Sequence, residues 1–341
     1  MQYSIYVMKA MVLNKPGPIE ENPLNLEDVE RPEPREGEIL VRLKACGICH
    51  TDLHTVEGEL DLPKLPLIPG HQIIGLVEAL GPEASTFKKG DRVGVPWLYC
   101  TCGECHYCKM DLENLCLSAQ FTGYHVDGGY AEYAAAKDAF AYPIPEGFTD
   151  RAAAPLLCAG IIGFRALRLC EVKPGQRLGL YGFGASAHVT IQIARHWGCE
   201  VYVFTRSKDH QNLADELGAA WVGKAEDTPP NSIQGAIIFA PVGHLALDAL
   251  RVMDKGATLA LAGIYMTPVP EIDYKLLYDE RTIRSVTAST REDARELLRY
   301  AGEIPIETEV QEFPLEDANK ALQMLKRSEI KGAGVLKIGT D

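Results

Sequence analysis

Residues 178–187 read LGLYGFGASA, an apolar run that passes through two closely spaced glycines and ends in small residues. The run approximates G-x-G-x-x-G/A, with Gly182 and Gly184 flanking Phe183 and with Ala187 in the last position. Gly182 would make a tight turn, and Gly184 would let the backbone approach a pyrophosphate at a helix N-terminus. A glycine pattern alone is weak, and an ordinary strand–helix turn is the alternative. The strand–turn–helix context favours a dinucleotide site.

Apolar strands alternate with helical stretches on both sides of this turn. The predicted strands span 178–181, 200–205, 236–240, 258–262 and 283–286, and the predicted helices span 187–197 and 208–217. Continuous apolar strands that alternate with helices predict a parallel sheet covered on both faces, which is a doubly wound α/β fold.

The end of the second predicted strand bears on the choice of cofactor. An NAD enzyme usually carries Asp or Glu about 20 residues after the glycine turn, where the carboxylate accepts from the ribose 2′-hydroxyl. Thr205 stands at that position here, and Arg206 and Ser207 follow it. With no carboxylate to repel a 2′-phosphate and a cation beside it, NADP(H) is favoured over NAD(H). The alternative is that Arg206 is merely solvated in a loop.

The first third of the chain has a different pattern. Short strands at 39–43, 73–79 and 92–95 lie between Pro and Gly residues, which predicts a β-rich domain resembling a partly open barrel. After about residue 289 we predict one clear helix at 315–327 and a closing strand at 334–338, and we expect this tail to return to the first domain.

Four cysteines are tightly clustered in the sequence, namely Cys102, Cys105, Cys108 and Cys116. Four thiolates at this spacing can surround one tetrahedral Zn²⁺ and leave no position for water, as in structural sites. Disulfides are the alternative, but three cysteines at i, i+3 and i+6 cannot all pair with one another. Cys100 lies just outside the set, and we expect it to be a bystander.

A second set of metal-ligand residue types is dispersed: Cys49, His71 and Cys158. Taken singly, each has a plain reading as a small core residue or a turn residue. Sequence spacing does not show that the three converge. If they do, two cysteines and one histidine would leave a fourth tetrahedral position open, which catalytic zinc requires.

Together these motifs resemble the medium-chain zinc-containing alcohol dehydrogenases, and in particular a bacterial branch, over nearly the whole chain. The resemblance implies a Rossmann-type dinucleotide domain at 151–289. It also implies a GroES-like catalytic domain at 1–150 and 290–341, with a structural zinc lobe at about 97–118. We therefore expect two zinc ions per chain and hydride transfer between NAD(P)(H) and a small alcohol, aldehyde or ketone.

The resemblance also implies roles for individual residues. Cys49, His71 and Cys158 would hold the catalytic zinc. Asp52 would orient His71, and Thr51 would bond the alcohol oxygen. The proton would pass through the nicotinamide ribose to His54. His50 would contact the pyrophosphate, and Trp97 would form a bulky wall of the substrate pocket. A buried core tryptophan is the alternative for Trp97.

Two positions depart from the family pattern. The family usually has Glu directly after the His71 equivalent, and this chain has Gln72. Many relatives place an Arg against the pyrophosphate near the C-terminus, where residues 331–334 read KGAG here. If that Glu helps to exchange ligands on zinc, the neutral amide of Gln72 should alter the exchange step or the charge at the site. The KGAG segment does not support the cofactor contact that the family places there.

Composition excludes several other classes. The formal net charge of −13, without a compensating basic stretch, disfavours nucleic acid as a partner. No run approaches the ~18 apolar residues of a membrane span, and the start shows no signal-peptide pattern. We expect a cytoplasmic enzyme that is a homo-oligomer, dimer or tetramer by analogy with relatives.

Two other functions compete with this interpretation. Zinc-free members of the same superfamily reduce activated C=C bonds, although the complete set of Cys49, His71 and Cys158 argues against that activity here. The second is a zinc-binding interaction module with a degenerate nucleotide fold, which would use the cysteine cluster as a binding surface.

Overall fold

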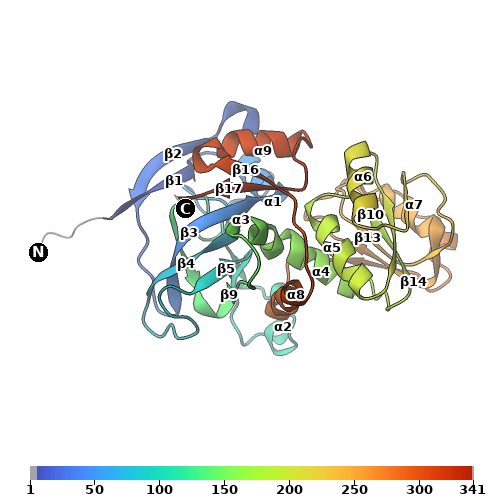
Figure 1. Ribbon diagram of the computed structural model, residues 1–341, viewed down its shortest axis with the longest axis horizontal. Helices are drawn as coiled ribbons and strands as arrows, with labels where there is room; N and C mark the ends of the chain where they lie inside the picture. The colour runs from blue at the N-terminus through green and yellow to red at the C-terminus, as the bar shows by residue number, and fades with distance from the viewer. Residues whose placement is uncertain (1–5, 340–341) are drawn as a thin grey trace, which may run out of the picture. The chain divides into compact units, whose positions relative to one another are not determined.

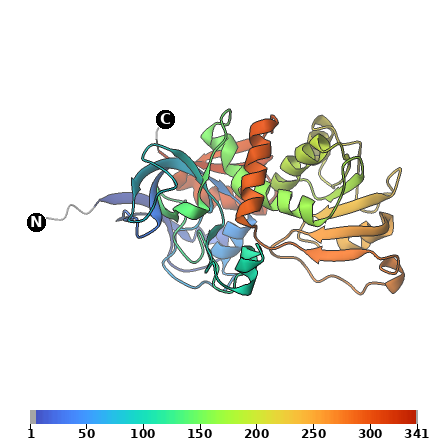
Figure 2. The ribbon, with the colours of Figure 1, turned by 90° about the horizontal axis from the view of Figure 1, so that it is seen from below.

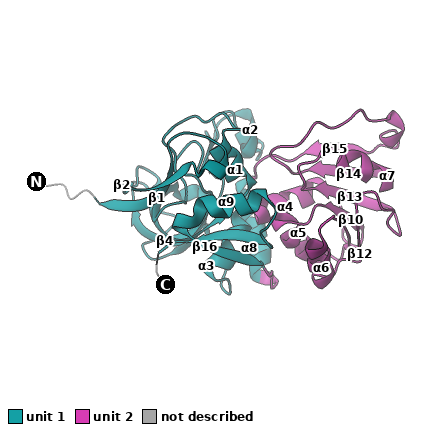
Figure 3. Cartoon of the chain, turned by 90° about the horizontal axis from the view of Figure 1, so that it is seen from above, with its two compact units in different colours: residues 1–158, 290–302, 308–341 teal, residues 159–289, 303–307 magenta. Residues whose placement is uncertain are grey.

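The computed structural model describes residues 6–339, which form two compact units. Unit 1 holds the chain up to Cys158, residues 290–302 and the chain from Thr308 onwards; unit 2 holds residues 159–289 and 303–307 (Figure 3). From the sequence, these borders are expected at residues 150 and 290. The first lies later because α3 (Asp150–Ala153) and η4 (Ala154–Leu157) pack against strands of unit 1.

Unit 1 is built on a seven-stranded sheet. In spatial order its strands are β16 (Val310–Pro314), β17 (Ala333–Lys337), β3 (Glu38–Ile48), β4 (Gln72–Leu80), β5 (Arg92–Val95) and β9 (Tyr142–Pro143), and β8 (Tyr133–Lys137) also pairs with β3. β3 pairs antiparallel with β4 and β17, and most of its side chains are buried. The closing strand β17, after residue 289, therefore lies in the first unit.

Two smaller two-stranded sheets and several short helices complete unit 1. The two sheets are β1 (Val7–Leu13) with β2 (Leu24–Glu30), and β6 (Leu98–Cys100) with β7 (Gln120–Phe121). The helices are η1 (Ile19–Glu21), α1 (His50–Glu57), α2 (His106–Lys109), η2 (Glu113–Leu115), η3 (Asp138–Phe140), η6 (Leu315–Asp317) and α9 (Ala318–Lys326). In Figure 1, α9 lies beside β16 and β17, and it also packs against α1 and η1.

The helix predicted at 315–327 corresponds to η6 and α9, but a second helix in the tail was not predicted. The structure also contains α8 (Arg291–Glu303), which belongs to unit 1 up to Gly302. Its buried residues include Ala294, Leu297, Leu298 and Ala301, which follow helical spacing. Charged residues occupy most other positions of this segment, so the apolar stripe is narrow.

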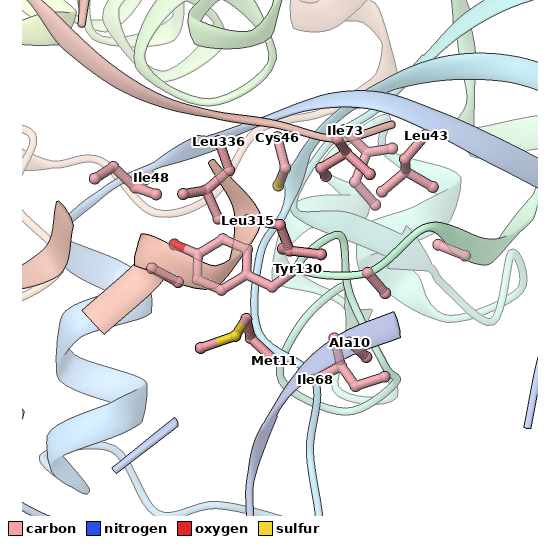
Figure 4. Close-up of a cluster of buried hydrophobic side chains, with 14 of the residues drawn as sticks. Ala10, Met11, Leu43, Cys46, Ile48, Ile68, Ile73, Tyr130, Leu315 and Leu336 are labelled. Atoms are coloured by element: carbon pink, nitrogen blue, oxygen red, sulfur yellow. The ribbon is translucent and has the colours of Figure 1, made fainter. Parts of the chain in front are cut away.

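The core of unit 1 surrounds Tyr130, whose side chain is fully buried among aliphatic residues (Figure 4). Its ring packs against Gly70, where an added Cβ would lie 2.4 Å from a ring carbon. Gly70 also has φ +98°, a conformation that side chains rarely adopt. Core packing therefore fixes the backbone directly before His71.

Unit 2 is a six-stranded parallel sheet with helices. Its strand order is β12 (Trp221–Gly223), β11 (Glu200–Phe204), β10 (Arg177–Tyr181), β13 (Ile233–Ile238), β14 (Met253–Leu261) and β15 (Thr282–Ser285). The helices are α4 (Ala159–Leu169), α5 (Ala185–His196), α6 (Lys208–Glu216), α7 (Leu245–Val252) and η5 (Tyr274–Leu276). Figure 2 shows the yellow-to-orange strands of this sheet side by side. The predicted doubly wound parallel sheet is confirmed, and its order reverses between β10 and β13.

No single helix within residues 6–339 is long and apolar enough to cross a membrane. One bent pair, Asp150–Leu157 with Ala159–Leu169, has the required length and composition.

A buried hydrogen bond joins β6 to β3 and generates a stability prediction. The Tyr99 hydroxyl donates to Glu38 Oε1 at 2.6 Å, and Glu38 is only 5% exposed. Burial alone would raise the pKa of Glu38, but hydrogen bonds from Tyr99 and the Arg35 N–H, with the Lys137 cation, lower it overall. Tyr99→Phe should therefore cost about 1–3 kcal/mol of unfolding free energy at neutral pH.

Because a lowered folded-state pKa contributes stability above the unfolded pKa, this loss should shrink as the pH falls through the lowered folded-state pKa of Glu38 and the carboxylate becomes protonated. Urea unfolding followed by circular dichroism measures the effect. Tyr6→Phe, at an exposed ring in the same unit, is the control. Equal midpoints for Tyr99→Phe and the parent protein would contradict the prediction.

Candidate functional site

Strand pairing brings the three dispersed metal-ligand residues together within unit 1. β3 and β4 are antiparallel, and Gly47 lies opposite Gln72. Cys49 follows the end of β3, and His71 directly precedes β4, so both lie at the same end of this strand pair. Cys158 directly follows η4, which packs against both strands. Segments from three parts of the chain thus converge.

The distances between the donor atoms are short. His71 Nε2 lies 3.3 Å from Cys49 Sγ and 3.3 Å from Cys158 Sγ, and the two sulfur atoms are 4.0 Å apart. For tetrahedral zinc with Zn–S of about 2.3 Å and Zn–N of about 2.0–2.1 Å, neighbouring sulfurs lie ~3.8 Å apart and S···N distances are ~3.5 Å. The three residues therefore fit one tetrahedral ion and leave a fourth position for another ligand.

The two thiols of this group share a hydrogen bond that shifts their pKa values in opposite directions. Cys158 donates toward Cys49, which lowers the pKa of Cys49 well below its usual value and raises the pKa of Cys158. One sulfur therefore takes the thiolate form that metals bind.

A buried carboxylate orients His71. Asp52 Oδ1 lies 2.9 Å from His71 Nδ1, and both side chains are at most 2% exposed. Asp52 Oδ2 accepts the backbone N–H of Cys49 at 2.9 Å, which forms part of the capping box of α1. Because an ionised carboxylate only accepts hydrogen bonds, an ionised Asp52 binds a protonated Nδ1, and Nε2 is the nitrogen that faces the two sulfurs.

The other residues predicted on α1 lie at different depths. Thr51 is buried, and its backbone N–H donates to Cys49 Sγ at 3.3 Å. His50 is exposed, and its ring centroid lies 6.3 Å from that of His54. His54 is half-buried near the end of the helix, where its Nδ1 contacts a carboxylate oxygen of Glu59. Sequence reasoning missed Glu59, because its contact with His54 depends on the cap of α1.

Trp97 contacts the metal-ligand group directly. Its ring meets the His71 imidazole edge-on, with centroids 4.9 Å apart. One indole face stacks on Phe121 at 4.9 Å with an interplanar angle of 12°, and Tyr124 lies at 5.8 Å. Trp97 is half-buried rather than part of the closed core. Sequence reasoning missed Phe121 and Tyr124, although both follow closely after the cysteine cluster.

The four clustered cysteines form a second group in unit 1. Cys102 Sγ lies 3.9 Å from Cys108 Sγ and 3.5 Å from Cys116 Sγ, and Cys105 and Cys108 are 3.5 Å apart. These separations approximate the ~3.8 Å expected between sulfurs around tetrahedral zinc. Backbone N–H groups of Glu104 and Cys105 lower the pKa of Cys102 to about 6, so it ionises readily.

Cys100 lies outside this group. Its thiol contacts Gln120 Oε1 at 3.5 Å across the β6–β7 pair. The two groups described here are the clusters within residues 6–339 whose ligand atoms all lie within 4.8 Å of one another.

The glycine turn of unit 2 lies where the strand order reverses. Gly182 directly follows β10 with φ +85°, and an added Cβ would be 3.1 Å from Ala240. Gly184 precedes α5 and provides no side-chain cap, and an added Cβ there would meet no described atom within 4 Å. Phe183 is buried between them. The open N-terminus of α5 can therefore accept an anionic group.

The next strand ends at the residues that bear on cofactor choice. Thr205 is mostly buried, and its backbone N–H donates to Gly223 at 2.8 Å. Arg206 is exposed, and Ser207 caps α6 by accepting the His210 N–H at 3.4 Å. The carboxyl end of β11 is thus followed by the Thr205 hydroxyl, the Arg206 guanidinium and the N-terminus of α6.

Both departures from the family pattern are visible. Gln72 is 2% exposed and its Nε2 has no hydrogen-bond partner, and its side chain fills the space where a Cβ on Gly47 would lie. Lys331, in the C-terminal KGAG segment, forms an ion pair with Glu309 at 2.8 Å.

Comparison with known proteins identifies the family of both parts of the chain. The family model described as "Alcohol dehydrogenase GroES-like domain" matches residues 35–146, and the one described as "Zinc-binding dehydrogenase" matches residues 187–303.

Several relatives match nearly the whole length. "Probable alcohol dehydrogenase AdhA" of Mycobacterium tuberculosis is 46% identical over 337 residues, with 97% of each chain covered. An alcohol dehydrogenase of Geobacillus stearothermophilus is 38% identical, with 93% of this chain and 96% of that chain covered. The solved structure of a cobalt- and zinc-bound thermostable alcohol dehydrogenase from Pyrobaculum aerophilum has a TM-score of 0.88 at 26% identity, covering 97% of this chain and 100% of that chain.

The similarity extends over both units and includes zinc-containing relatives. The chain therefore belongs to the medium-chain zinc-containing alcohol dehydrogenase family, whose members are oxidoreductases that act on alcohols with zinc and a nicotinamide cofactor.

Proposed function

We propose that this alcohol dehydrogenase acts on small alcohols and their carbonyl products at a catalytic zinc held by Cys49, His71 and Cys158. The observation that carries the proposal is the set of 3.3, 3.3 and 4.0 Å separations among the three donor atoms. Three protein ligands with one open position characterise catalytic zinc sites.

The surrounding residues prepare this centre for substrate. When bound, zinc would act as a Lewis acid on the substrate oxygen, and the nicotinamide would supply the hydride chemistry. Asp52 holds the proton on His71 Nδ1 and so keeps Nε2 aimed at the metal position. Trp97, stacked on Phe121, forms a rigid wall beside His71 that favours small substrates.

The proton released during oxidation needs acceptors of its own. In this proposal the Thr51 hydroxyl bonds the substrate oxygen and takes its proton, and His54 holds the proton at the outer end of the path. Thr51 is buried next to Cys49, whereas His54 is partly exposed, so the path runs toward water along one face of α1.

We further propose a structural zinc at Cys102, Cys105, Cys108 and Cys116. Two short helices and a turn supply these cysteines. Little apolar packing stabilises this segment, because α2 contains no buried residue. A metal bound by four thiolates would therefore replace a hydrophobic core in the lobe.

The cofactor that we propose is NADP(H). The proposal rests on Thr205 in place of an acidic residue and on the exposed Arg206, next to the N-terminus of α6. A guanidinium that binds a phosphate forms charge-assisted hydrogen bonds. The turn of Gly182, Phe183 and Gly184 would contact the pyrophosphate.

Metal content tests both zinc sites. The purified enzyme should contain two zinc ions per chain by atomic emission, and Cys158→Ala should contain one because only the catalytic set loses a ligand. Cys105→Ser should also lose one zinc and should unfold more readily. Cys100→Ser, whose thiol belongs to neither group, should retain two. Two zinc ions in Cys158→Ala would refute the catalytic set, and a zinc-free active enzyme would favour the C=C reductase.

The proton path predicts a pH-dependent defect. His54→Gln should slow alcohol oxidation about tenfold or more below about pH 7, because few other bases are then available to take the proton. At high pH the defect should fade. Steady-state kcat measured across pH, with His106→Gln on the zinc lobe as control, tests this. A profile identical to that of the parent enzyme would remove His54 from the path.

Cofactor preference is measured by kcat/KM with NADPH and NADH. We expect a preference for NADPH, and Arg206→Ala should lower kcat/KM for NADPH about ten- to hundredfold, because charge-assisted hydrogen bonds to phosphate are lost. The value for NADH should change little. Lys255→Ala, at the amino end of β14, is the control for the loss of one positive charge elsewhere in unit 2. Equal losses with both cofactors would contradict a 2′-phosphate site.

A further inference from the structure

The C-terminal cap of α1 turns the chain back over the last helical turn. Gly58 has φ +75°, and its N–H donates to the carbonyls of His54 and Thr55. The N–H of Glu59 then donates to the His54 carbonyl at 3.0 Å. A Cβ on Gly58 would lie 2.9 Å from Pro16, so both conformation and packing favour glycine here. The cap therefore fixes Glu59 beside His54.

The side chains of the same two residues also meet. A Glu59 carboxylate oxygen, Oε2, is in hydrogen-bond contact with His54 Nδ1. The His54 side chain is 14% exposed and that of Glu59 is 47% exposed, so the pair lies at the boundary between protein and water. Glu59 therefore binds His54 through both its backbone and its side chain.

The other acid near this helix end has different partners. Glu57 Oε1 accepts from Lys326 of α9 at 2.8 Å and from the N–H of Ile19 at 3.0 Å. The imidazole of His50 is also near, and its ring centroid lies 6.3 Å from that of His54. Glu59 thus contacts the His54 imidazole, whereas Glu57 binds Lys326 and the N–H of Ile19.

We propose that Glu59 is a positioning residue that holds a proton on His54 Nδ1 and so directs the lone pair of Nε2 toward the proton released by the substrate. This rests on the proposed role of His54. A neutral imidazole has one donor and one acceptor nitrogen, and a carboxylate only accepts. The nitrogen that faces Glu59 is therefore the donor, and Nε2 is the base.

The proton balance of the step is simple. Nε2 takes up one proton, and His54 becomes an imidazolium that keeps its Nδ1–H bond to Glu59. The positive charge then faces a carboxylate, which stabilises the protonated form. Loss of one proton from the imidazolium to water restores the neutral ring. His71 is held in the same way, because its Nδ1 contacts Asp52, but its Nε2 faces the cysteine sulfurs.

The experiment combines a spectroscopic and a kinetic measurement on the full-length zinc enzyme. With ¹⁵N-labelled histidine, the His54 signals are assigned by their loss in His54→Gln. We expect the Nδ1–H tautomer in the parent enzyme and in Glu59→Gln, whose amide oxygen still accepts. Glu59→Ala should lose this preference. Asp61→Ala, which removes one negative charge from the same loop, should keep it.

The kinetic arm measures kcat and KM for alcohol oxidation across pH. Glu59→Ala should lower kcat about tenfold at low pH with KM little changed, as expected when a residue that orients a functional imidazole is removed. Glu59→Gln should lie between Glu59→Ala and the parent, and Asp61→Ala should match the parent.

Three outcomes would overturn the proposal. An unchanged His54 tautomer in Glu59→Ala would show that the carboxylate does not hold the proton. A lost tautomer with parent-like kinetics, while His54→Gln is slow, would show that the contact has no role in oxidation. Parent-like kinetics in His54→Gln itself would refute the proton path as well, and this result separates failure of the proposed function from failure of the Glu59 proposal alone.

Discussion

The site of unit 1 depends on the antiparallel pairing of β3 and β4. Because Gly47 lies opposite Gln72, the residues just beyond the paired ends, Cys49 and His71, emerge at the same place. A shift of one residue would turn every side chain of a strand to the opposite face and separate the sulfur from the imidazole. Burial of both strands makes such a shift costly. The arrangement of the three donor atoms is therefore a consequence of core packing, to which the close contact of Gly70 with Tyr130 contributes.

In unit 2 the candidate cofactor site lies at one end of a parallel sheet. The strand order reverses between β10 and β13, the place where doubly wound sheets bind their ligands, and the glycine turn directly follows β10. Gly182 satisfies a backbone requirement, since its φ is positive, whereas no described atom lies near the Cβ position of Gly184, which leaves room there for the proposed pyrophosphate. The two glycines therefore serve different physical purposes, although they are equivalent letters in the pattern.

Periodicity and local spacing predicted most of this architecture, and they failed where contacts are non-local. The parallel sheet follows from apolar runs between helices, and the four clustered cysteines form one group because they are close in sequence. The convergence of Cys49, His71 and Cys158 could not be derived from spacing, since it depends on strand register; only the family resemblance suggested it. α8 was missed because charges surround its narrow apolar stripe. The Glu59 contact depends on a left-handed cap, which residue patterns alone do not place in space.

Helix α1 connects these features, since its two ends carry the polar contacts of two imidazoles. At its start, Cys49 and Asp52 form the capping box, and Asp52 also holds His71. At its end, Gly58 brings Glu59 against His54. An isolated helix of eight residues is unstable in water, so its position must come from tertiary contacts. These are the buried Leu53 and Val56 and the packing of α1 against α9 and η1. The returning C-terminal segment, distant in sequence, therefore helps to fix both His71, proposed as a zinc ligand, and His54, proposed as the proton acceptor.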